Sequence, residues 1–478
     1  MTIKTFFSHL LLLLVCQSCA NTPKHHPWQE MERVLARIVP PRFPGQSWNV
    51  RDFGAGEGQD ITRAIAAAIA ACHAAGGGSV IIPAGEYVTG AITLKSNVNL
   101  HLSEGTLLKF STNPKDYTPF VLSRWEGIDC YNYSPLIYAR GAENVAVTGK
   151  GVLDGQADNA RWWPWKGSRE HGWQPGMSSQ HFRPGSPAGR ERLARMNEER
   201  VPVEQRVMDE EDCLRPPFIQ FLDCKNVLIE GITITRAPFW LIHPLLCENV
   251  TIREVRLESH GPNNDGCDPE SCQDVLIERC YFNNGDDCIA IKSGRDNDGR
   301  TWNVASENII VRDNVMRNGH GGVVIGSEVS GNCRNVWVEN CEMNSANLDR
   351  VIRIKSNAVR GGVIENIFVR DIRVGECKEA IFRVEMKYEK VVDGPYLPVV
   401  RNIHLENISC RKSRYGLFID GFADRNQVYD VFVKNCTFEG IQDRTPNRIT
   451  GAGNVAFDRV FINGQKIESA NITNHERL

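Results

Sequence analysis

One stretch decides the fold, Cys224-Lys225-Asn226-Val227-Leu228-Ile229-Glu230, in which a polar pair precedes apolar residues that alternate with polar ones. Such alternation predicts a β-strand. The pattern returns with its apolar reference residue at Val227, Val250, Val275, Ile309, Val336, Ile367, Ile403 and Val431. Neighbouring reference residues are separated by 23, 25, 34, 27, 31, 36 and 28 residues. A short repeat with variable insertions is typical of a solenoid.

The segments between these strands contain no amphipathic helix of ten or more residues. A sheet built from βαβ units needs such helices to return the chain between parallel strands. The sequence therefore predicts an all-β protein with a parallel β-helix, in which each coil packs on its neighbours. Because a repeat architecture absorbs length in one body, residues 48–478 are interpreted as one domain.

The cysteines keep fixed places in the repeat. Sixteen are present, and fourteen remain when Cys16 and Cys19 are set aside. Four precede the reference residue by three positions (Cys224, Cys247, Cys272 and Cys333), and three follow it by five (Cys280, Cys341 and Cys436). Equivalent positions of neighbouring coils stack about 4.8 Å apart, and Cys suits an inward ladder. We predict mostly free, buried thiols, although export favours disulfides and the stacking distance allows them.

The first residues indicate export. Lys4 precedes a short apolar core from Leu10 to Val15, which is too short to span a bilayer. We interpret residues 1–18 as a signal peptide of the lipoprotein type, with Cys19 as the lipidated first residue; ordinary cleavage near Ala20 is the alternative. Residues 19–47 are interpreted as a linker. The predicted location is the periplasm or the outer membrane, with membrane contact only through the lipid, or else secretion.

Composition narrows the partners. The net charge is -3, without the basic surplus of a nucleic-acid binder. No Cys/His group has zinc spacing, and no Gly-rich loop precedes a helix to hold phosphate. We therefore expect no metal and no other cofactor. We also expect a monomer. The stretch Asp296-Asn297-Asp298-Gly299 hints at a calcium loop, but no Glu closes it, so a surface turn is favoured.

Two segments depart from the repeat. Residues 60–73 have apolar residues at helical spacing and stop at Gly76-Gly77-Gly78, which predicts a helix that caps the open end of the solenoid. Residues 156–217 hold four Trp with many charged residues, Pro and Gly. We interpret them as a long inserted loop with some helix near 189–199. Such insertions often shape a cleft; the alternative is a flap without a role.

Four polar motifs follow one another along successive coils. They are Asn263-Asn264-Asp265-Gly266, Gly285-Asp286-Asp287, Gly319-His320-Gly321 and Arg353-Ile354-Lys355. Taken singly, each is typical of a turn, a solvated loop or an exposed strand. Asp265 and Asp286 are 21 residues apart, close to one coil, so stacking brings the motifs to one face.

The motifs suit an acidic substrate and carboxylate chemistry. Adjacent Asp286 and Asp287 would face opposite sides of a regular strand, so both serve one site only at a bend, which Gly285 permits. Arg353 and Lys355 lie on one face, and two cations there suit a substrate with carboxylates. Crowding of three carboxyls is expected to raise at least one pKa.

These motifs resemble glycoside hydrolase family 28, the polygalacturonases, and the resemblance covers nearly the whole mature chain. It begins at Asp52-Phe53-Gly54-Ala55 and Pro83-Ala84-Gly85-Glu86-Tyr87 and runs through all four motifs. One departure is Asn264, where the family has Thr. The resemblance implies a right-handed parallel β-helix. It also implies an inverting hydrolase that cleaves α-1,4 galacturonosyl linkages of pectin or oligogalacturonides. The insertion at 156–217 would wall off one end of the cleft, which favours action at chain ends.

The resemblance also implies roles for single residues. Asp286 is expected to act as the general acid, Asp265 and Asp287 to activate water, and His320 to help hold a proton on Asp286. In inverting enzymes the acid and base are roughly 6.5–9.5 Å apart. The implied substrate-binding residues are Asn263, Arg353, Lys355 and Tyr388, and we add Lys292 and Arg295 as further cations near the same site.

Other functions stay open at this point. A rhamnogalacturonan or xylogalacturonan hydrolase of the same family ranks second. A pectate lyase shares the β-helix but abstracts a proton with Arg or Lys and usually needs calcium. A non-catalytic polysaccharide-binding β-helix has no reason to gather carboxylates, imidazole and cations on one face.

Overall fold

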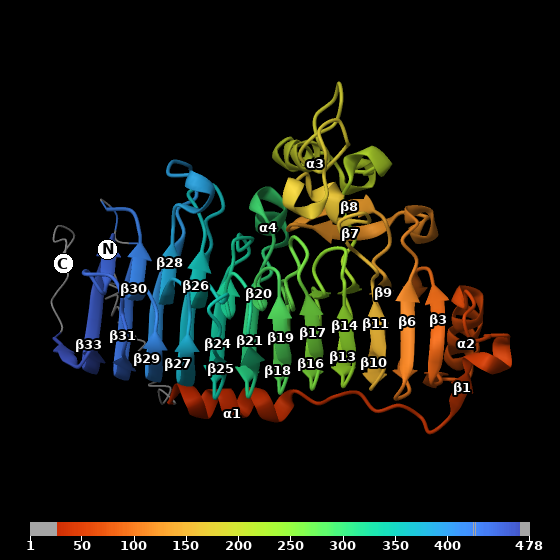
Figure 1. Cartoon of the computed structure of the whole chain (residues 1–478), viewed down its shortest axis with the longest axis horizontal. Helices are drawn as coiled ribbons and strands as arrows, with labels where there is room; N and C mark the ends of the chain where they lie inside the picture. Colours follow the sequence, from red (N-terminus) through yellow and green to blue (C-terminus); the bar gives the residue numbers. More distant parts are fainter. Residues whose placement is uncertain (1–25, 424, 426, 469–478) are drawn as a thin grey trace, which may run out of the picture.

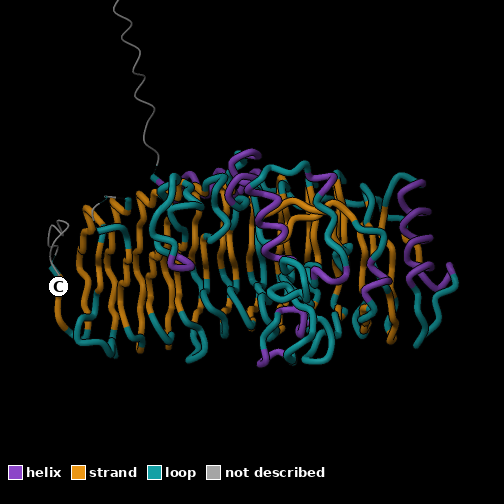
Figure 2. The backbone as a smooth tube through the Cα atoms, turned by 90° about the horizontal axis from the view of Figure 1, so that it is seen from above, coloured by secondary structure: helices purple, strands orange, loops and turns teal. Residues whose placement is uncertain are grey.

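The chain forms one long parallel β-helix (Figure 1), and the view from above shows the coils stacked side by side along its length (Figure 2). The computed structural model describes residues 26–423, 425 and 427–468. The predicted signal peptide and Cys19 lie outside the described residues. Among the described helices, none is both long and apolar enough to cross a membrane.

The repeat predicted from the sequence is the register of the main sheet. Parallel pairing places the reference residues in one row: Val227, Val250, Val275, Ile309, Val336, Ile367, Ile403 and Val431. Asn or Asp commonly precedes the reference residue with a left-handed backbone, as at Asn226 (φ 56°) and Asn249 (φ 57°), a conformation that these two residue types tolerate. The predicted parallel β-helix is confirmed.

Two faces of the solenoid carry the strands. The larger sheet comprises β1 (Ser47–Asn49), β2 (Gly78–Ile82), β3 (Gly85–Thr89), β5 (Val98–Leu102), β6 (Thr106–Phe110), β10 (Glu143–Gly149), β11 (Val152–Asp154), β13 (Lys225–Glu230), β14 (Thr233–Thr235), β16 (Glu248–Arg253), β17 (Arg256–Ser259), β18 (Gln273–Glu278), β19 (Tyr281–Asn284), β21 (Ser306–Arg312), β22 (Val315–Met316), β24 (Cys333–Glu339), β25 (Glu342–Met343), β27 (Val363–Glu376), β29 (Val399–Lys412), β31 (Val428–Phe438), β33 (Ala452–Ile462) and β34 (Gln465–Ile467). Its pairs are parallel except for β33 with β34.

The second face begins with β4 (Ile92–Thr93), β9 (Ile137–Arg140), β12 (Ile219–Leu222) and β15 (Ile242–Leu245), and continues with β20 (Ile289–Ile291), β23 (Val323–Ile325), β26 (Arg350–Lys355), β28 (Ala380–Glu385), β30 (Tyr415–Asp420) and β32 (Arg448–Thr450). Cys267 bridges the two parts, because it pairs with both Ile242 and Ile289. An antiparallel hairpin of β7 (Val121–Trp125) and β8 (Ile128–Asn132) stands above this face.

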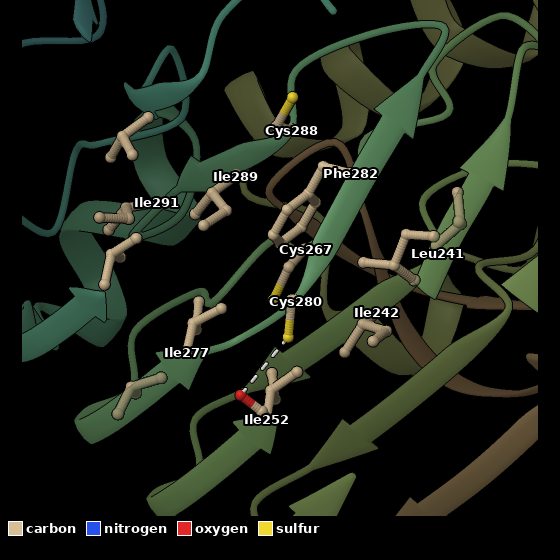
Figure 3. Packing of buried hydrophobic residues seen from close by; sticks show 14 of the residues in the cluster. Leu241, Ile242, Ile252, Cys267, Ile277, Cys280, Phe282, Cys288, Ile289 and Ile291 are labelled. Atoms are coloured by element: carbon tan, nitrogen blue, oxygen red, sulfur yellow. Dashed lines mark hydrogen bonds between the residues drawn. The ribbon is translucent and has the colours of Figure 1, made fainter. Parts of the chain in front are cut away.

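The core runs the length of the solenoid and includes the cysteines. All fourteen cysteines of the described chain are free and buried, which confirms the prediction of free thiols. Cys280 shows the packing: its thiol donates to the Ile252 carbonyl oxygen of the preceding coil at 3.8 Å and lies near Phe282 and Ile277 (Figure 3). Burial raises the pKa of Cys280 to about 12, so this thiol is a poor nucleophile.

Helices cover the exposed parts of the solenoid. The α-helices are α1 (Pro27–Arg37), α2 (Thr62–Ala74), α3 (Gly189–Glu198) and α4 (Asp296–Trp302); the 3-10 helices are η1 (Val50–Phe53), η2 (Pro114–Tyr117), η3 (Trp163–Lys166), η4 (Arg169–His171), η5 (Val203–Gln205), η6 (Glu210–Asp212) and η7 (Tyr388–Lys390). Helix α2 closes the N-terminal end of the coil stack with Ile65, Ala68 and Ile69 buried. The predicted capping helix is confirmed.

The structure differs from the sequence prediction at two places. Residues 27–37, within the predicted linker, form α1, which lies along the coils with Met31 and Val34 buried against Trp337. The amphipathic spacing of α1 buries an apolar stripe that a linker would expose. The segment predicted as a surface turn forms helix α4, which begins at Asp296. Asp298 in this helix is buried, and its carboxylate accepts hydrogen bonds from Arg206 Nη1 at 2.6 Å and from the Asp129 backbone amide at 2.9 Å, which compensate for the lost water.

Candidate active site

Three aspartates meet at bends on the second face. Asp265 follows β17, and Asp286 and Asp287 lie between β19 and β20. One carboxylate oxygen from each lies within 4.8 Å of the other two. A Cβ at position 285 would stand 2.5 Å from the Gly261 carbonyl oxygen, so the bend that turns both aspartates into one site requires Gly285.

Asp286 is paired with His320. The His320 ring nitrogen Nδ1 lies 2.9 Å from Asp286 Oδ1. Burial raises the pKa of Asp286, but the hydrogen bond and charge of His320, with the charge of Lys355, outweigh it and hold that pKa below its usual range. The same hydrogen bond raises the pKa of His320. The hydrogen bond therefore favours a protonated imidazole beside an ionised Asp286.

Asp265 lies in a buried charge cluster. Its pKa is raised well above the usual range by burial and by the nearby carboxylates of Asp268 and Asp286. Lys292 Nζ lies 3.9 Å from Asp265 Oδ2, 3.4 Å from Asp268 Oδ1 and 3.2 Å from Glu328 Oε2. Lys292 is 2% exposed. The predicted substrate-binding Lys292 is thus already engaged by three carboxylates, and its contact with Asp265 makes it a positioning residue.

The cations of β26 face the same site. Lys355 Nζ donates to Asp287 Oδ2 at 2.8 Å, and Arg353 Nη2 donates to Glu385 Oε2 at 2.9 Å. Both cations lie near the Tyr388 ring, 5.7 Å from its centre for Arg353 and 5.3 Å for Lys355. Arg353 Nε is buried without a hydrogen-bond acceptor in the described part of the chain. Arg353 and Lys355 both line the pocket, so they are the cations of β26 that a carboxylate there would meet.

The first motif is held by its two asparagines. Asn263 Oδ1 accepts a hydrogen bond from Arg215 Nη2 at 2.9 Å. Asn264 is fully buried; its Oδ1 accepts from Ser259 Oγ and the Gly261 amide, and its Nδ2 donates to backbone carbonyls. Asn264 therefore fixes the bend before Asp265, which explains how Asn replaces Thr there.

These side chains line a pocket of about 360 Å³, at the small end of the range for ligand sites. The lining residues are Glu126, Lys166, His181, Arg190, Trp240, Asn263, Asp265, Asp286, Lys292, His320, Ser327, Glu328, Arg353, Lys355, Tyr388 and Glu389. The structure thus brings together the predicted site residues, and Asp287 lies directly beneath, bonded to Lys355. The predicted Arg295 braces Glu126 instead, at 3.3 Å.

Sequence reasoning missed the residues that close the pocket. Lys166, His181 and Arg190 come from the insertion, Glu126 from the β7–β8 turn and Glu389 from η7. None of them belongs to the repeated strands, so the repeat could not predict that they lie at the pocket. Asp268, which contacts Lys292 beneath the pocket, was also missed, although it lies only three residues after Asp265 and two after the end of the first motif.

The three aspartates are also spaced as metal ligands could be. Each of them, however, has a protein cation against it: Lys292 at 3.9 Å, His320 at 2.9 Å and Lys355 at 2.8 Å. The protein itself thus supplies the charge that a metal ion would provide. The carboxylate oxygens are closer together than the range expected for an acid and base in an inverting enzyme.

A parallel β-helix with this carboxylate, imidazole and cation cluster defines a glycoside hydrolase. Residues 205–411 match the model of glycosyl hydrolases family 28. A crystal structure of a hyperthermoactive exopolygalacturonase from Thermotoga maritima is similar, with 42% identity, a TM-score of 0.88, and coverage of 93% of this chain and 98% of that chain. The chain belongs to glycosyl hydrolases family 28.

Two further relatives are more distant. A probable polygalacturonase of Vitis vinifera is 28% identical over 78% of this chain and 71% of its own length. An exo-poly-alpha-D-galacturonosidase of Dickeya chrysanthemi is 26% identical over 71% of this chain and 57% of its own length. The similarity to the enzyme from Dickeya chrysanthemi extends over little more than half of that protein.

Proposed function

We propose that this chain hydrolyses the α-1,4 linkages between galacturonate units of pectin, releasing product from chain ends. The observation that carries the proposal is the pocket itself, which is lined by Asp265, Asp286 and His320 together with Arg353 and Lys355, while Asp287 lies within 4.8 Å of the two other carboxylates. A pair of carboxyl groups is what hydrolysis of a glycosidic bond requires, one to protonate the leaving oxygen and one to activate water. The two cations can bind the carboxylate of a galacturonate unit through charged hydrogen bonds. The names of the relatives support this substrate.

Each group has a chemical task in this proposal. The proton passes from His320 Nδ1 to Asp286 and from Asp286 to the leaving glycosidic oxygen. The attacking water gives a proton to Asp265 or Asp287. The Oδ1 atoms of both are buried and accept no hydrogen bond within the described chain, so each has an acceptor to offer a water that enters the site. A raised pKa makes Asp265 a stronger base once it is ionised.

We keep inversion of the anomeric centre as part of the proposal. The short spacing of the carboxylates does not by itself favour it. The two free acceptors of Asp265 and Asp287 do favour it, because a pair of acceptors suits a bound water better than direct attack by one carboxylate. Proton NMR of the first product tests this step: a β-anomer supports inversion, and an α-anomer contradicts it.

Action at chain ends is supported by the walls of the pocket. Arg190 Nε bonds to Glu126 at 2.7 Å, and Arg190 Nη2 bonds to Glu389 at 3.0 Å. This bridge joins the insertion to η7, which leave the solenoid on opposite sides of the aspartates along its axis. A polymer lying straight along the coils meets this bridge. A chain end entering the pocket does not need to pass it.

The proposed activity is tested with polygalacturonic acid in the presence of EDTA. We expect new reducing ends, saturated products and release of small products without a fast fall in viscosity. Saturated products distinguish hydrolysis from a lyase, and a fast fall in viscosity would contradict action at chain ends. Absence of cleavage, with cleavage of rhamnogalacturonan or xylogalacturonan instead, would favour the second-ranked functions. Loss of activity in EDTA would show that a metal ion takes part.

We also propose that the chain is exported and anchored by a lipid on Cys19, as a monomer in the periplasm or the outer membrane. The support is the short apolar run from Leu10 to Val15, followed by Cys19 directly after the small residue Ser18. Mass spectrometry of the mature N-terminus is expected to find a diacylglyceryl-modified Cys19. An unmodified N-terminus near Ala20 would contradict the anchor and favour secretion.

A further inference from the structure

The insertion holds a cation at the pocket in a fixed position. Lys166 ends η3, and Trp163 Nε1 in the same turn donates to the Ala237 carbonyl oxygen at 2.9 Å. Trp162 and Trp165 pack edge to face, with ring centres 5.0 Å apart, and Trp162 is buried in the main core. These contacts anchor η3 on the solenoid, so Lys166 is presented to the pocket from a rigid turn.

Lys166 differs from the other cations of the pocket in its lack of a counter-ion. Lys292, Lys355, Arg353 and Arg190 each contact a carboxylate within 4.0 Å. Over the described residues, Lys166 Nζ has no carboxylate oxygen within that distance. Burial lowers the pKa of Lys166, as expected for an ammonium that gives up water without gaining a partner. An anionic ligand would provide that partner.

His181 adds a neutral donor beside this cation. Burial, with the positive charges of Lys166 and Arg190, lowers the pKa of His181 to about 4, so the ring is neutral near pH 7. Gln180 Oε1 accepts from Arg215 Nη2 at 3.1 Å, which leaves the Gln180 amide nitrogen 3.1 Å from His181 Nε2. Nε2 of His181 is therefore the acceptor of this contact. The ring proton lies on Nδ1, where it is available to donate.

The two cationic regions flank the aspartates along the solenoid axis. Arg353 and Lys355 belong to β26, on the C-terminal side of the coils that carry Asp265 and Asp286. The insertion leaves the solenoid between β11 and β12, on the N-terminal side of those coils.

We propose that Lys166 and His181 form a second carboxylate site, which binds the galacturonate unit on the other side of the cleaved linkage from Arg353 and Lys355. The inference rests on the proposed function and adds a requirement to it. Both sugars that flank the cleaved bond must carry a free carboxylate. The proposal assigns Lys166 to the terminal sugar at the non-reducing end and Arg353 and Lys355 to the next sugar, so a methyl ester on the terminal sugar removes the partner of Lys166. A charged hydrogen bond is worth enough to change the rate about 10- to 100-fold.

The test compares trigalacturonate with the same trisaccharide carrying a methyl ester on its non-reducing terminal unit. Wild-type protein is expected to have a kcat/KM about 10- to 100-fold lower for the ester. Lys166→Met is expected to lose a similar factor on the free acid, mainly through KM, and to show little further loss on the ester. Arg169→Met is the matched control, because Arg169 is exposed three residues further along the insertion, and it should behave as wild type.

The outcomes separate this inference from the proposed function. If wild-type protein cleaves the ester and the free acid equally well, the second carboxylate site is wrong while the hydrolase assignment stands. This comparison needs no variant, so it holds even where Lys166→Met fails to fold. An ester penalty that persists unchanged in Lys166→Met would also overturn the site. If wild-type protein cleaves neither trisaccharide, the proposed function itself is contradicted.

Discussion

Asp286→Asn is expected to lower kcat for galacturonan hydrolysis by about 10²- to 10⁴-fold, the usual contribution of a general acid. The Asn amide cannot deliver a proton to the leaving oxygen. Its carbonyl oxygen can still accept the hydrogen bond from His320 Nδ1, which lies 2.9 Å from the present Asp286 Oδ1. The fold and the KM should therefore change little. The measurement is steady-state release of reducing ends, with circular dichroism to verify folding.

The control for this variant is Asp313→Asn. Asp313 lies in a turn with φ 57°, where Asn is well tolerated, and it is remote from the pocket lining. This variant should keep wild-type kinetics. If Asp286→Asn retained more than about one tenth of wild-type kcat, the assignment of Asp286 as the acid would be wrong, and Asp265 would be the next candidate because its pKa is raised.

His320→Gln is expected to lower kcat/KM by about 10²-fold and to change its pH profile. The hydrogen bond and charge of Asp286 raise the pKa of His320, so the imidazolium is present below that raised pKa and disappears as pH rises through it. Wild-type activity should therefore fall on the alkaline side, at a pH above the ordinary His value of about 6.5. Gln holds no proton, so the variant should lose this alkaline limb.

A pH series of kcat/KM from about pH 4 to 9 measures this effect and brackets the ordinary His value. His73→Gln serves as the control, since His73 is an exposed residue of α2 whose Nδ1 contacts the Ser96 carbonyl oxygen. Its profile should match that of wild type. An unchanged alkaline limb in His320→Gln would mean that another group holds the proton, and the His320–Asp286 relay would be wrong.

Much of the solenoid could be predicted from the sequence because its order is local. Each coil repeats the same alternation, so the residue opposite Val227 could be named as Val250 without any tertiary information, and the structure pairs them. The same repeat also predicted that the site residues lie together. Asp265 and Asp286 were expected about one coil apart, and they meet within 4.8 Å.

The protonation of the site could not be predicted in the same way. Crowding was expected to keep a proton in the carboxylate cluster, with His320 helping to hold it on Asp286. Burial and crowding do raise one pKa, as expected, but it is that of Asp265, whereas the pKa of Asp286 is lowered. The difference arises because Asp265 is surrounded by buried carboxylates, whereas Asp286 contacts an imidazole. The groups that a carboxylate contacts are decided by differences of a few ångströms in side-chain position. The spacing of the coils along the sequence does not predict such differences.

The sequence by itself determined the β-helix, its register, the capping helix and the convergence of the four motifs, because each follows from a periodicity of short range. Only the tertiary structure decided what closes the pocket. Lys166 and Arg190 are far from the aspartates along the chain and belong to no repeat, and α1 packs on the coils although its segment suggested a linker. Such contacts depend on surfaces that exist only after the coils have stacked, so no local pattern encodes them.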